Sequence, residues 1–398
     1  RRDTQRRLQM GISPEDCPRD IKITKVEQVR LEVDRPEIGT NSRAEEIIYP
    51  EPNWKWEEGV IRIHNSDGTL GWGVGRADAE VGRRALNRSP FDLLDPGTGV
   101  SDEFRGLENA LWDSIGKILG VPAYRLIGDR SYADWLPVYD STIYFNDLLY
   151  DSNEAGLRRI AEDAESSVRN GFRACKMKIG RGCFLMDHDE GLERDIEVVK
   201  IMRRIAGEDF TIHVDANNGY TYDETVAFLD ATSDVGVFWI EEMFEEEVEA
   251  YRNLKAAIKE RNLKTFIADG ESRSREPLEF YTPFFEEGVL DVIQHDIRAL
   301  GITGWRRLSE MAGEHGVKCA PHNWSSLLGL FLSFQLGKAI PNFLYGECAT
   351  LTSDVIDTSG YVFKDGAFSV PDTPGLGLEL NQRVYDEQYA GREAWVVE

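Results

Sequence analysis

Seven short apolar segments in the later part of the chain each end in side chains suited to acid–base or metal chemistry. In chain order these side chains are Lys176 and Lys178, Asp215 and Asn217, Glu241, Asp269 and Glu271, Asp296, His322, and Glu347. Solvent exposure explains a polar residue at one strand end, but not at seven in succession. If the segments are parallel strands of one barrel, their ends meet on the face where barrel enzymes have their sites.

The carboxylates Asp215, Glu241 and Glu271 come from three successive segments and predict a metal site. Three acids directed into one mouth repel one another unless a cation lies among them. Ligands that are all oxygen favour a hard ion, Mg²⁺ first, with Mn²⁺ possible. Asp269 is an alternative to Glu271, because alternate residues of a strand share a face. Separate surface acids paired with Lys or Arg would not explain the placement strand by strand.

Two groups could act as bases. Lys176 and Lys178 share a strand face, so each raises the cost of charging the other, which predicts a lysine pKa lowered towards neutrality. His322 follows the seventh segment, and Asp296 on the sixth could hydrogen-bond its ring and select the tautomer. The alternatives are two surface lysines and a structural histidine.

The elements that must position these residues are strands alternating with helices. Strand-like runs are expected at 136–142, 174–180, 210–217, 237–243, 264–270, 291–297, 318–324 and 342–348, with helices between them such as 155–170 and 303–315. This alternation predicts a parallel barrel rather than an open sheet.

The first ~130 residues predict a separate α+β module. It contains a strand at 21–33, a hairpin at 59–75 around Asp67-Gly68, and a helix at 103–119 that ends at Gly120. The expected divisions are an N-terminal extension (1–20), a capping domain (21–133), the barrel (134–360) and a C-terminal segment that returns to the capping domain (361–398).

Composition excludes several classes of partner. The formal net charge of −25 over 398 residues argues against binding to nucleic acid or to anionic membrane surfaces. The longest apolar run, 327–336, is far shorter than the ~20 residues of a spanning helix. The five cysteines form no CxxC pair, and the first ten residues lack the apolar stretch of a secretory signal, so we expect a reduced, cytoplasmic location.

Taken together, the motifs resemble those of the enolase superfamily, and within it the mandelate racemase/muconate lactonizing enzyme family, mandelate racemase branch. The similar segments are KMKIG (176–180), VDANNGY (214–220), WIEEM (239–243), DGES (269–272), DVIQHD (291–296) with GITGW (301–305), PHNW (321–324), the helix segment at 106–128 and PDTPGLGLEL (371–380). The resemblance spans about residues 21–385. It implies a modified TIM (β/α)7β barrel with an α+β N-terminal capping domain, in which residues 34–58 form the loop that selects the substrate.

The resemblance also implies a mechanism. A substrate carboxylate binds Mg²⁺, a base removes the α-proton, and the metal stabilises the resulting enediolate. Lys178 and the His322–Asp296 pair would lie on opposite faces of the substrate. Lys176 and Glu347 would contact the carboxylate or enediolate, with Glu347 as a protonated donor. Further substrate contacts are expected from Asn217 and from Trp54 and Trp56 in the capping loop.

The expected reaction is therefore dehydration of an acid sugar, an aldonate or aldarate, to a 2-keto-3-deoxy acid, in carbohydrate acid catabolism and by a homo-oligomer. A racemase, epimerase or cycloisomerase of hydroxy acids is the alternative within the same chemistry. A non-catalytic barrel that binds acid sugars is the alternative from another class. Such a barrel would have lost its bases, but Lys178 and His322 are both present.

Overall fold

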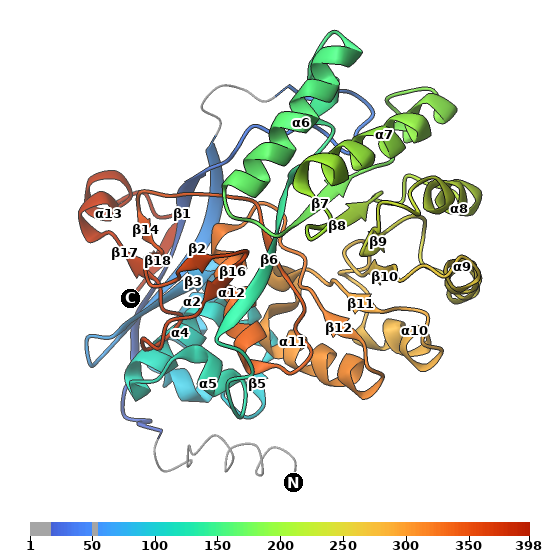
Figure 1. Ribbon diagram of the computed structural model, residues 1–398. Helices are drawn as coiled ribbons and strands as arrows, with labels where there is room; N and C mark the ends of the chain where they lie inside the picture. Colours follow the sequence, from blue (N-terminus) through green and yellow to red (C-terminus); the bar gives the residue numbers. More distant parts are fainter. Residues whose placement is uncertain (1–16, 50–54) are drawn as a thin grey trace.

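A computed structural model describes residues 17–49 and 55–398. A barrel surrounded by helices forms one part of the molecule, and an antiparallel sheet with its own helices lies beside it (Figure 1). Trp54 and most of the predicted extension at 1–20 lie outside the described residues.

The barrel is built from parallel strands in sequence order. They are β6 (Trp135–Ile143), β7 (Ala174–Lys178), β8 (Thr211–Asp215), β9 (Trp239–Glu241), β10 (Phe266–Asp269), β11 (Val292–Ile293), β12 (Lys318–Cys319) and β13 (Gly346–Cys348). β13 pairs with β6. The N–H of Cys319 donates to the carbonyl of Asn342 at 2.8 Å, and the N–H of Leu344 donates to the carbonyl of Cys319 at 2.8 Å. These bonds close the barrel between β12 and the residues before β13.

Helices follow the strands in turn. They are α6 (Asn153–Arg169), α7 (His188–Ala206), α8 (Tyr222–Ala231), α9 (Val248–Glu260), α10 (Thr282–Glu286), α11 (Ile297–Glu314) and α12 (Leu327–Ala339), with 3-10 turns η3 (Asn146–Leu149), η4 (Arg181–Cys183) and η5 (Leu278–Tyr281). This order confirms the predicted (β/α)7β barrel. The barrel strands are buried on both faces, as covered parallel strands must be; all five residues of β7 are buried.

The helix predicted at 303–315 is longer in the structure. α11 begins at Ile297, and Gly301, at φ 69° and ψ 174°, separates its first turn from the rest. The apolar pattern therefore reports only the part after Gly301. Within the described residues, no helix has the length and apolar character needed to cross a membrane.

The capping sheet contains β1 (Ile23–Asp34), β2 (Lys55–Asn65), β3 (Leu70–Val74) and β18 (Trp395–Val397), in the order β18-β1-β2-β3. The predicted hairpin turn lies at Gly68, whose φ is 87°. Around the sheet are α2 (Ala79–Ala85), α3 (Pro90–Leu93), β4 (Leu94–Asp95), β5 (Gly99–Val100), η2 (Asp102–Leu107), α4 (Glu108–Leu119) and α5 (Ala123–Ile127). α4 begins five residues later than predicted, after the 3-10 turn η2.

The C-terminal segment runs over both parts of the molecule. It contains β14 (Ile356–Asp357), β15 (Phe363–Lys364), β16 (Ala367–Ser369), β17 (Glu379–Leu380) and α13 (Gln382–Gln388) before β18. β16 extends the barrel sheet antiparallel to β6, and β18 pairs with β1 in the capping sheet. The last strand therefore covers an edge of β1 that would otherwise be exposed.

Buried acids of the capping domain join it to the barrel and to the C-terminal segment. Glu58 accepts hydrogen bonds from the Leu328 N–H at 3.2 Å, from the Ser326 hydroxyl at 3.1 Å and from the Leu327 N–H, all at the start of α12. Glu108 on α4 accepts from the Thr303 N–H at 2.7 Å. Because a helix N-terminus presents unpaired N–H groups, a carboxylate there is stabilised. These contacts fix the cap over the barrel mouth.

Candidate active site

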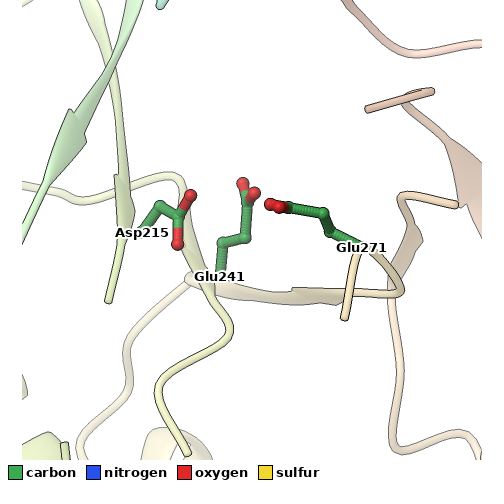
Figure 2. Close-up of side chains that lie close together, drawn as sticks. All are labelled: Asp215, Glu241 and Glu271. Carbon is green, nitrogen blue, oxygen red and sulfur yellow. The ribbon is translucent and has the colours of Figure 1, made fainter. Parts of the chain in front are cut away.

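The predicted metal ligands lie together at the carboxyl ends of three adjacent strands. Asp215, Glu241 and Glu271 each offer a carboxylate oxygen, and these atoms lie within 4.8 Å of one another. Figure 2 shows the three carboxylates turned toward a common space, with Glu241 between the other two. Asp215 and Glu241 are fully buried.

Asp269 lies on a different side from Glu271, although strand alternation predicts a shared face. β10 ends at Asp269, and Gly270 follows at φ 133°, a conformation that glycine adopts readily. The chain therefore turns before Glu271, and alternation does not continue. The Asp269 carboxylate accepts hydrogen bonds from the Tyr251 hydroxyl and from the Gly270 N–H, the latter at 2.6 Å.

Lys176 and Lys178 are both buried and held by carboxylates. The Lys176 ammonium lies 2.8 Å from Glu241 and 3.3 Å from Glu347, and Lys178 donates to Asp215 and, at 2.9 Å, to Asn217. Burial alone would lower the pKa of each lysine. The charges of Glu241 and Glu347 instead raise the pKa of Lys176 above the usual value, and the charge of Asp215 does the same for Lys178. The expectation of a lowered lysine pKa is therefore wrong for the metal-free protein: each lysine does repel the other, but the nearby carboxylates outweigh that repulsion.

The pKa values of Glu241 and Asp215 are shifted in opposite directions, although the two carboxyl groups share the same surroundings. Burial and the charge of Asp215 raise the pKa of Glu241 to about 8. Burial would also raise the pKa of Asp215, but Lys178 and Lys176 lower it far below its ordinary value. One Glu241 oxygen accepts hydrogen bonds from the Gln294 amide at 2.9 Å and the Trp239 indole at 3.2 Å. Gln294 was not predicted as a site residue, although it lies within the quoted DVIQHD motif.

His322 and Asp296 form the predicted pair, with 3.0 Å between Nδ1 and the Asp296 carboxylate. Asp296 also caps α11 by accepting from the N–H groups of Arg298 and Ala299, both at 2.9 Å, so its carboxylate is held in place. His322 Nε2 lies 3.3 Å from a Glu271 oxygen. Burial would lower the pKa of His322, but the charges of Glu271 and other neighbouring acids raise it to about 9 in the metal-free protein.

Glu347 lies in β13 beside Lys176, but its ionisation differs from the protonated donor that the family resemblance implies. Burial would raise its pKa, but the charges of Lys176 and His322 lower it, and its carboxylate accepts a hydrogen bond from the Asn323 N–H at 2.7 Å. Glu347 is therefore an ionised acceptor in the metal-free protein.

A cavity of about 770 Å³ opens above these groups, beneath the capping loop. Lys178, Glu271 and His322 line it from the barrel, together with Tyr144, Arg298 and Trp324. Ten loop residues between 35 and 49 complete the described lining, among them Arg35 and Arg43. Trp324 lines the cavity, whereas Trp56, predicted to contact the substrate, packs edge-on against Trp324 with 5.2 Å between ring centroids and is not among the described lining residues.

Glu242 and Arg43 form a link that the sequence did not predict. Glu242 is buried and has a positive φ of 42°, which is uncommon for a residue other than glycine and marks strain of the kind found at functional sites. Its carboxylate accepts from the Ser272 N–H and from Arg43, both at 2.7 Å, and Arg43 also contacts the Glu271 Oε1 at 2.7 Å. The adjacent acids in WIEEM were the available signal, but only Glu241 lies at the expected strand end.

The donor set fits a divalent cation. Glu271 Oε2 is buried and accepts no hydrogen bond, but it lies 3.3 Å from His322 Nε2, while Arg43 holds Oε1. A buried carboxylate oxygen without a hydrogen bond is costly unless a positive charge, here the protonated His322 or a bound metal ion, lies beside it. Together with the oxygens of Asp215 and Glu241, it forms an all-carboxylate set suited to Mg²⁺.

Comparison with known proteins identifies the family. The model of the family described as "Enolase C-terminal domain-like" matches residues 159–384, which include the three carboxylates and also Lys178 and His322. The chain belongs to the enolase superfamily.

The similar proteins of this superfamily include acid-sugar enzymes. A galacturonate dehydratase from Geobacillus sp., solved with D-galacturonate and 5-keto-4-deoxy-D-galacturonate, is 31% identical, with a TM-score of 0.86 over 95% of this chain and 99% of that chain. A mandelate racemase/muconate lactonizing protein from Geobacillus sp. Y412MC10, solved with magnesium and tartrate, is 31% identical, with a TM-score of 0.87 over 96% and 98%. Arabinonate dehydratase from Saccharolobus solfataricus is 28% identical over 71% of this chain and 70% of its own length.

Proposed function

We propose that this enolase-superfamily chain is a Mg²⁺-dependent hydro-lyase that dehydrates an acid sugar to a 2-keto-3-deoxy acid. The observation that carries the proposal is the position of two candidate bases at opposite ends of the row of carboxylates formed by Asp215, Glu241 and Glu271. Lys178 contacts Asp215 at one end, and His322 lies 3.3 Å from Glu271 at the other. Both line one cavity. The dehydratases among the similar proteins support the same reaction class.

Each residue then has a defined role. A cation held by Asp215, Glu241 and Glu271 would supply Lewis-acid stabilisation of the negative charge that develops on the substrate carboxylate. One base takes the α-proton, and the C–H electron pair moves onto the carboxylate to form an enediolate. The other base gives a proton to the β-hydroxyl as its C–O bond breaks, which releases water and leaves an enol that tautomerises to the keto acid.

The remaining residues hold the substrate and the bases. Lys176 provides a fixed positive charge beside the carboxylate, and Asn217 orients the Lys178 ammonium through a 2.9 Å hydrogen bond. Asp296 holds the His322 ring at Nδ1, so Nε2 faces the cavity. A base on each side also suits racemisation or epimerisation, in which the second base returns the proton to the α-carbon.

The test is incubation with Mg²⁺ and a library of aldonates, uronates and aldarates, followed by detection of the dehydrated keto acids, which are 2-keto-3-deoxy products from aldonates and 5-keto-4-deoxy products from uronates. Dehydration of at least one acid is expected. Deuterium from D₂O at the α-carbon of recovered substrate, without any keto acid, would refute the dehydratase proposal, and inversion at that carbon would then identify a racemase or epimerase.

Variants test the roles of the bases. K178A and H322N should each abolish turnover with Mg²⁺ affinity nearly unchanged, because neither side chain is a metal ligand. H188N is the matched control, since the His188 side chain is exposed, and it should remain active. Activity that persists in K178A or H322N would rule out these assignments.

A further inference from the structure

Tyr144 follows directly after β6, the barrel strand for which the sequence predicts no site residue. It therefore lies at the same face of the barrel as the residues that follow the other strands. The Lys178 ammonium lies over its ring, 5.4 Å from the ring centroid, a distance at which a cation is attracted to an aromatic face. Because Lys178 also contacts Asp215, Tyr144 is placed at the Asp215 end of the row of carboxylates.

The Tyr144 hydroxyl is open to the cavity. The residue is only 6% exposed and lines the cavity together with Lys178. Its hydroxyl makes no hydrogen bond within the described residues, although the hydroxyl of a buried tyrosine usually has a partner. Tyr139, whose ring lies 5.4 Å from the Lys176 ammonium, has a hydroxyl that is enclosed by protein, whereas the Tyr144 hydroxyl is not enclosed. A molecule in the cavity can therefore supply the missing partner.

The capping loop fixes the backbone on the far side of Tyr144. The Phe145 N–H donates to the Thr40 carbonyl at 3.0 Å, and the Gly39 N–H donates to the Asn146 side chain at 2.6 Å. A Cβ at Gly39 would lie 2.6 Å from the Phe145 carbonyl oxygen, so the loop and the end of β6 are in direct contact. The phenol is therefore held in place before any ligand binds, which lowers the cost of binding.

The chemistry of the phenol favours a hydroxyl of the ligand as its partner. Burial raises the pKa of Tyr144, so the phenol keeps its proton and is a neutral donor and acceptor. A sugar hydroxyl is likewise both donor and acceptor, and neither group brings a charge that must be matched. With the substrate carboxylate at the cation and Lys178 beside the α-carbon, the hydroxyls nearest to Tyr144 are those on carbons 2 and 3.

We infer that the Tyr144 hydroxyl binds a substrate hydroxyl on carbon 2 or carbon 3, and that Tyr144 is a specificity-determining residue of this site. The inference rests on the proposed function, because it assumes that the substrate carboxylate lies at Asp215, Glu241 and Glu271. Tyr144 then selects for a hydroxyl group beside the reacting carbon, while the cation selects for the carboxylate.

The experiment is a double-mutant cycle between Tyr144 and the substrate hydroxyls, measured as binding. H322N removes turnover but keeps Lys178 and Tyr144, so calorimetry in Mg²⁺ compares H322N with H322N/Y144F. The ligands are D-gluconate, D-galactonate and the 2-deoxy and 3-deoxy forms of each. A neutral hydrogen bond of ordinary strength predicts that removing the contacted hydroxyl weakens binding to H322N about two- to tenfold more than binding to H322N/Y144F.

Equal losses in the two proteins for all four deoxy acids overturn the inference, and so does the absence of binding by both parent acids. H322N/Y132F is the control, because Tyr132 is an exposed tyrosine that precedes β6 at the other end of the barrel. It should show the same losses as H322N.

Unfolding in urea separates a hydroxyl that binds ligand from one that stabilises the fold. Tyr220 is also 6% exposed, but its hydroxyl donates to Asp195 at 2.9 Å. Y220F should therefore lower the urea midpoint, whereas Y144F should leave it unchanged because no protein partner is lost. A fall in Y144F equal to that in Y220F would show a structural hydroxyl and overturn the inference.

Turnover by the wild-type protein and by Y144F decides the proposed function separately. Coupling in the binding cycle supports the role of Tyr144 even if no acid is dehydrated. Dehydration without any coupling leaves the proposed function intact and overturns the role of Tyr144. If both hold, Y144F should lower kcat/KM about two- to tenfold for the acid that is dehydrated, and Y132F should not.

Discussion

Replacing Glu242 by glutamine tests whether the link between the capping loop and the metal ligands positions the metal site. Glu242 touches the residues around two of the three carboxylates: its oxygens accept from the Ser272 N–H at 2.7 Å and from the Asn217 amide at 3.4 Å. It also binds Arg43, which holds Glu271. Glutamine has the same shape and keeps one acceptor oxygen, but it is neutral and cannot form the ion pair with the Arg43 guanidinium.

The expected size of the effect follows from the contact that is lost. A hydrogen bond to a charged group contributes about 1.5–3 kcal/mol, and each 1.4 kcal/mol is tenfold in affinity. Loss of a group that orients a metal ligand typically weakens metal binding about 10–100-fold. We therefore expect the Mg²⁺ Kd of E242Q to rise about 10–100-fold, since Glu271 is no longer held with Oε2 toward the other ligands.

The assay is titration of metal-free protein with Mg²⁺ by calorimetry, with unfolding measured in parallel. E246Q is the matched control. Glu246 is a buried acid four residues later that pairs with Arg273 at 3.0 Å, so this variant also removes a buried charge near the site. A Kd for E242Q within twofold of the wild-type value would refute the reasoning. An equal loss in E246Q would show that charge, not positioning, is responsible.

Two further predictions concern pH and the joint between domains. The pKa of His322 in the folded, metal-free protein is about 9, above its value of 6.5 in an unfolded chain, so its contribution to stability is present below pH 6.5 and is lost as the pH rises through 9. Urea unfolding between pH 6 and 10 should show this decline in the free energy of unfolding, and H322N should reduce it. An identical dependence on pH in both proteins would contradict the assignment. E58A should lower the free energy of unfolding by about 1–3 kcal/mol, because the N–H groups at the start of α12 lose a buried acceptor. Chemical denaturation measures this loss, and E57A is the control, because the neighbouring Glu57 is exposed. An unchanged denaturation midpoint for E58A would contradict a stabilising contact between Glu58 and α12.

The alternation of strands and helices could be predicted from sequence because it depends on local periodicity. Each of the eight strand-like segments overlaps a barrel strand, and each polar residue predicted at a strand end lies within the last three residues of a strand or up to three residues beyond it. Parallel strands place their carboxyl ends on one face of the barrel, so residues predicted at strand ends are also predicted to lie near one another in space. Asp215, Glu241 and His322 could be grouped for this reason.

Local periodicity could not resolve residues beyond a strand end. Alternation did not distinguish Asp269 from Glu271, since Gly270 turns the chain between them. It also missed Glu242, whose positive φ directs its carboxylate to Ser272 and Arg43. The positions of these side chains depend on backbone conformations at Gly270 and Glu242, which the pattern of apolar residues does not indicate.

The sequence by itself determined the barrel, the strand-end acids and the lysine and histidine that are proposed as bases, because side-chain type and spacing along each strand are properties of the chain. The tertiary structure alone decided which charges meet through space. It brings Arg35 and Arg43 from the capping loop to a cavity whose other charged groups lie more than a hundred residues later in the chain. It also surrounds Lys176 and Lys178 with carboxylates, which reverses the direction of their expected pKa shift. Electrostatic energy depends on distance and burial, and neither is set until the fold is complete.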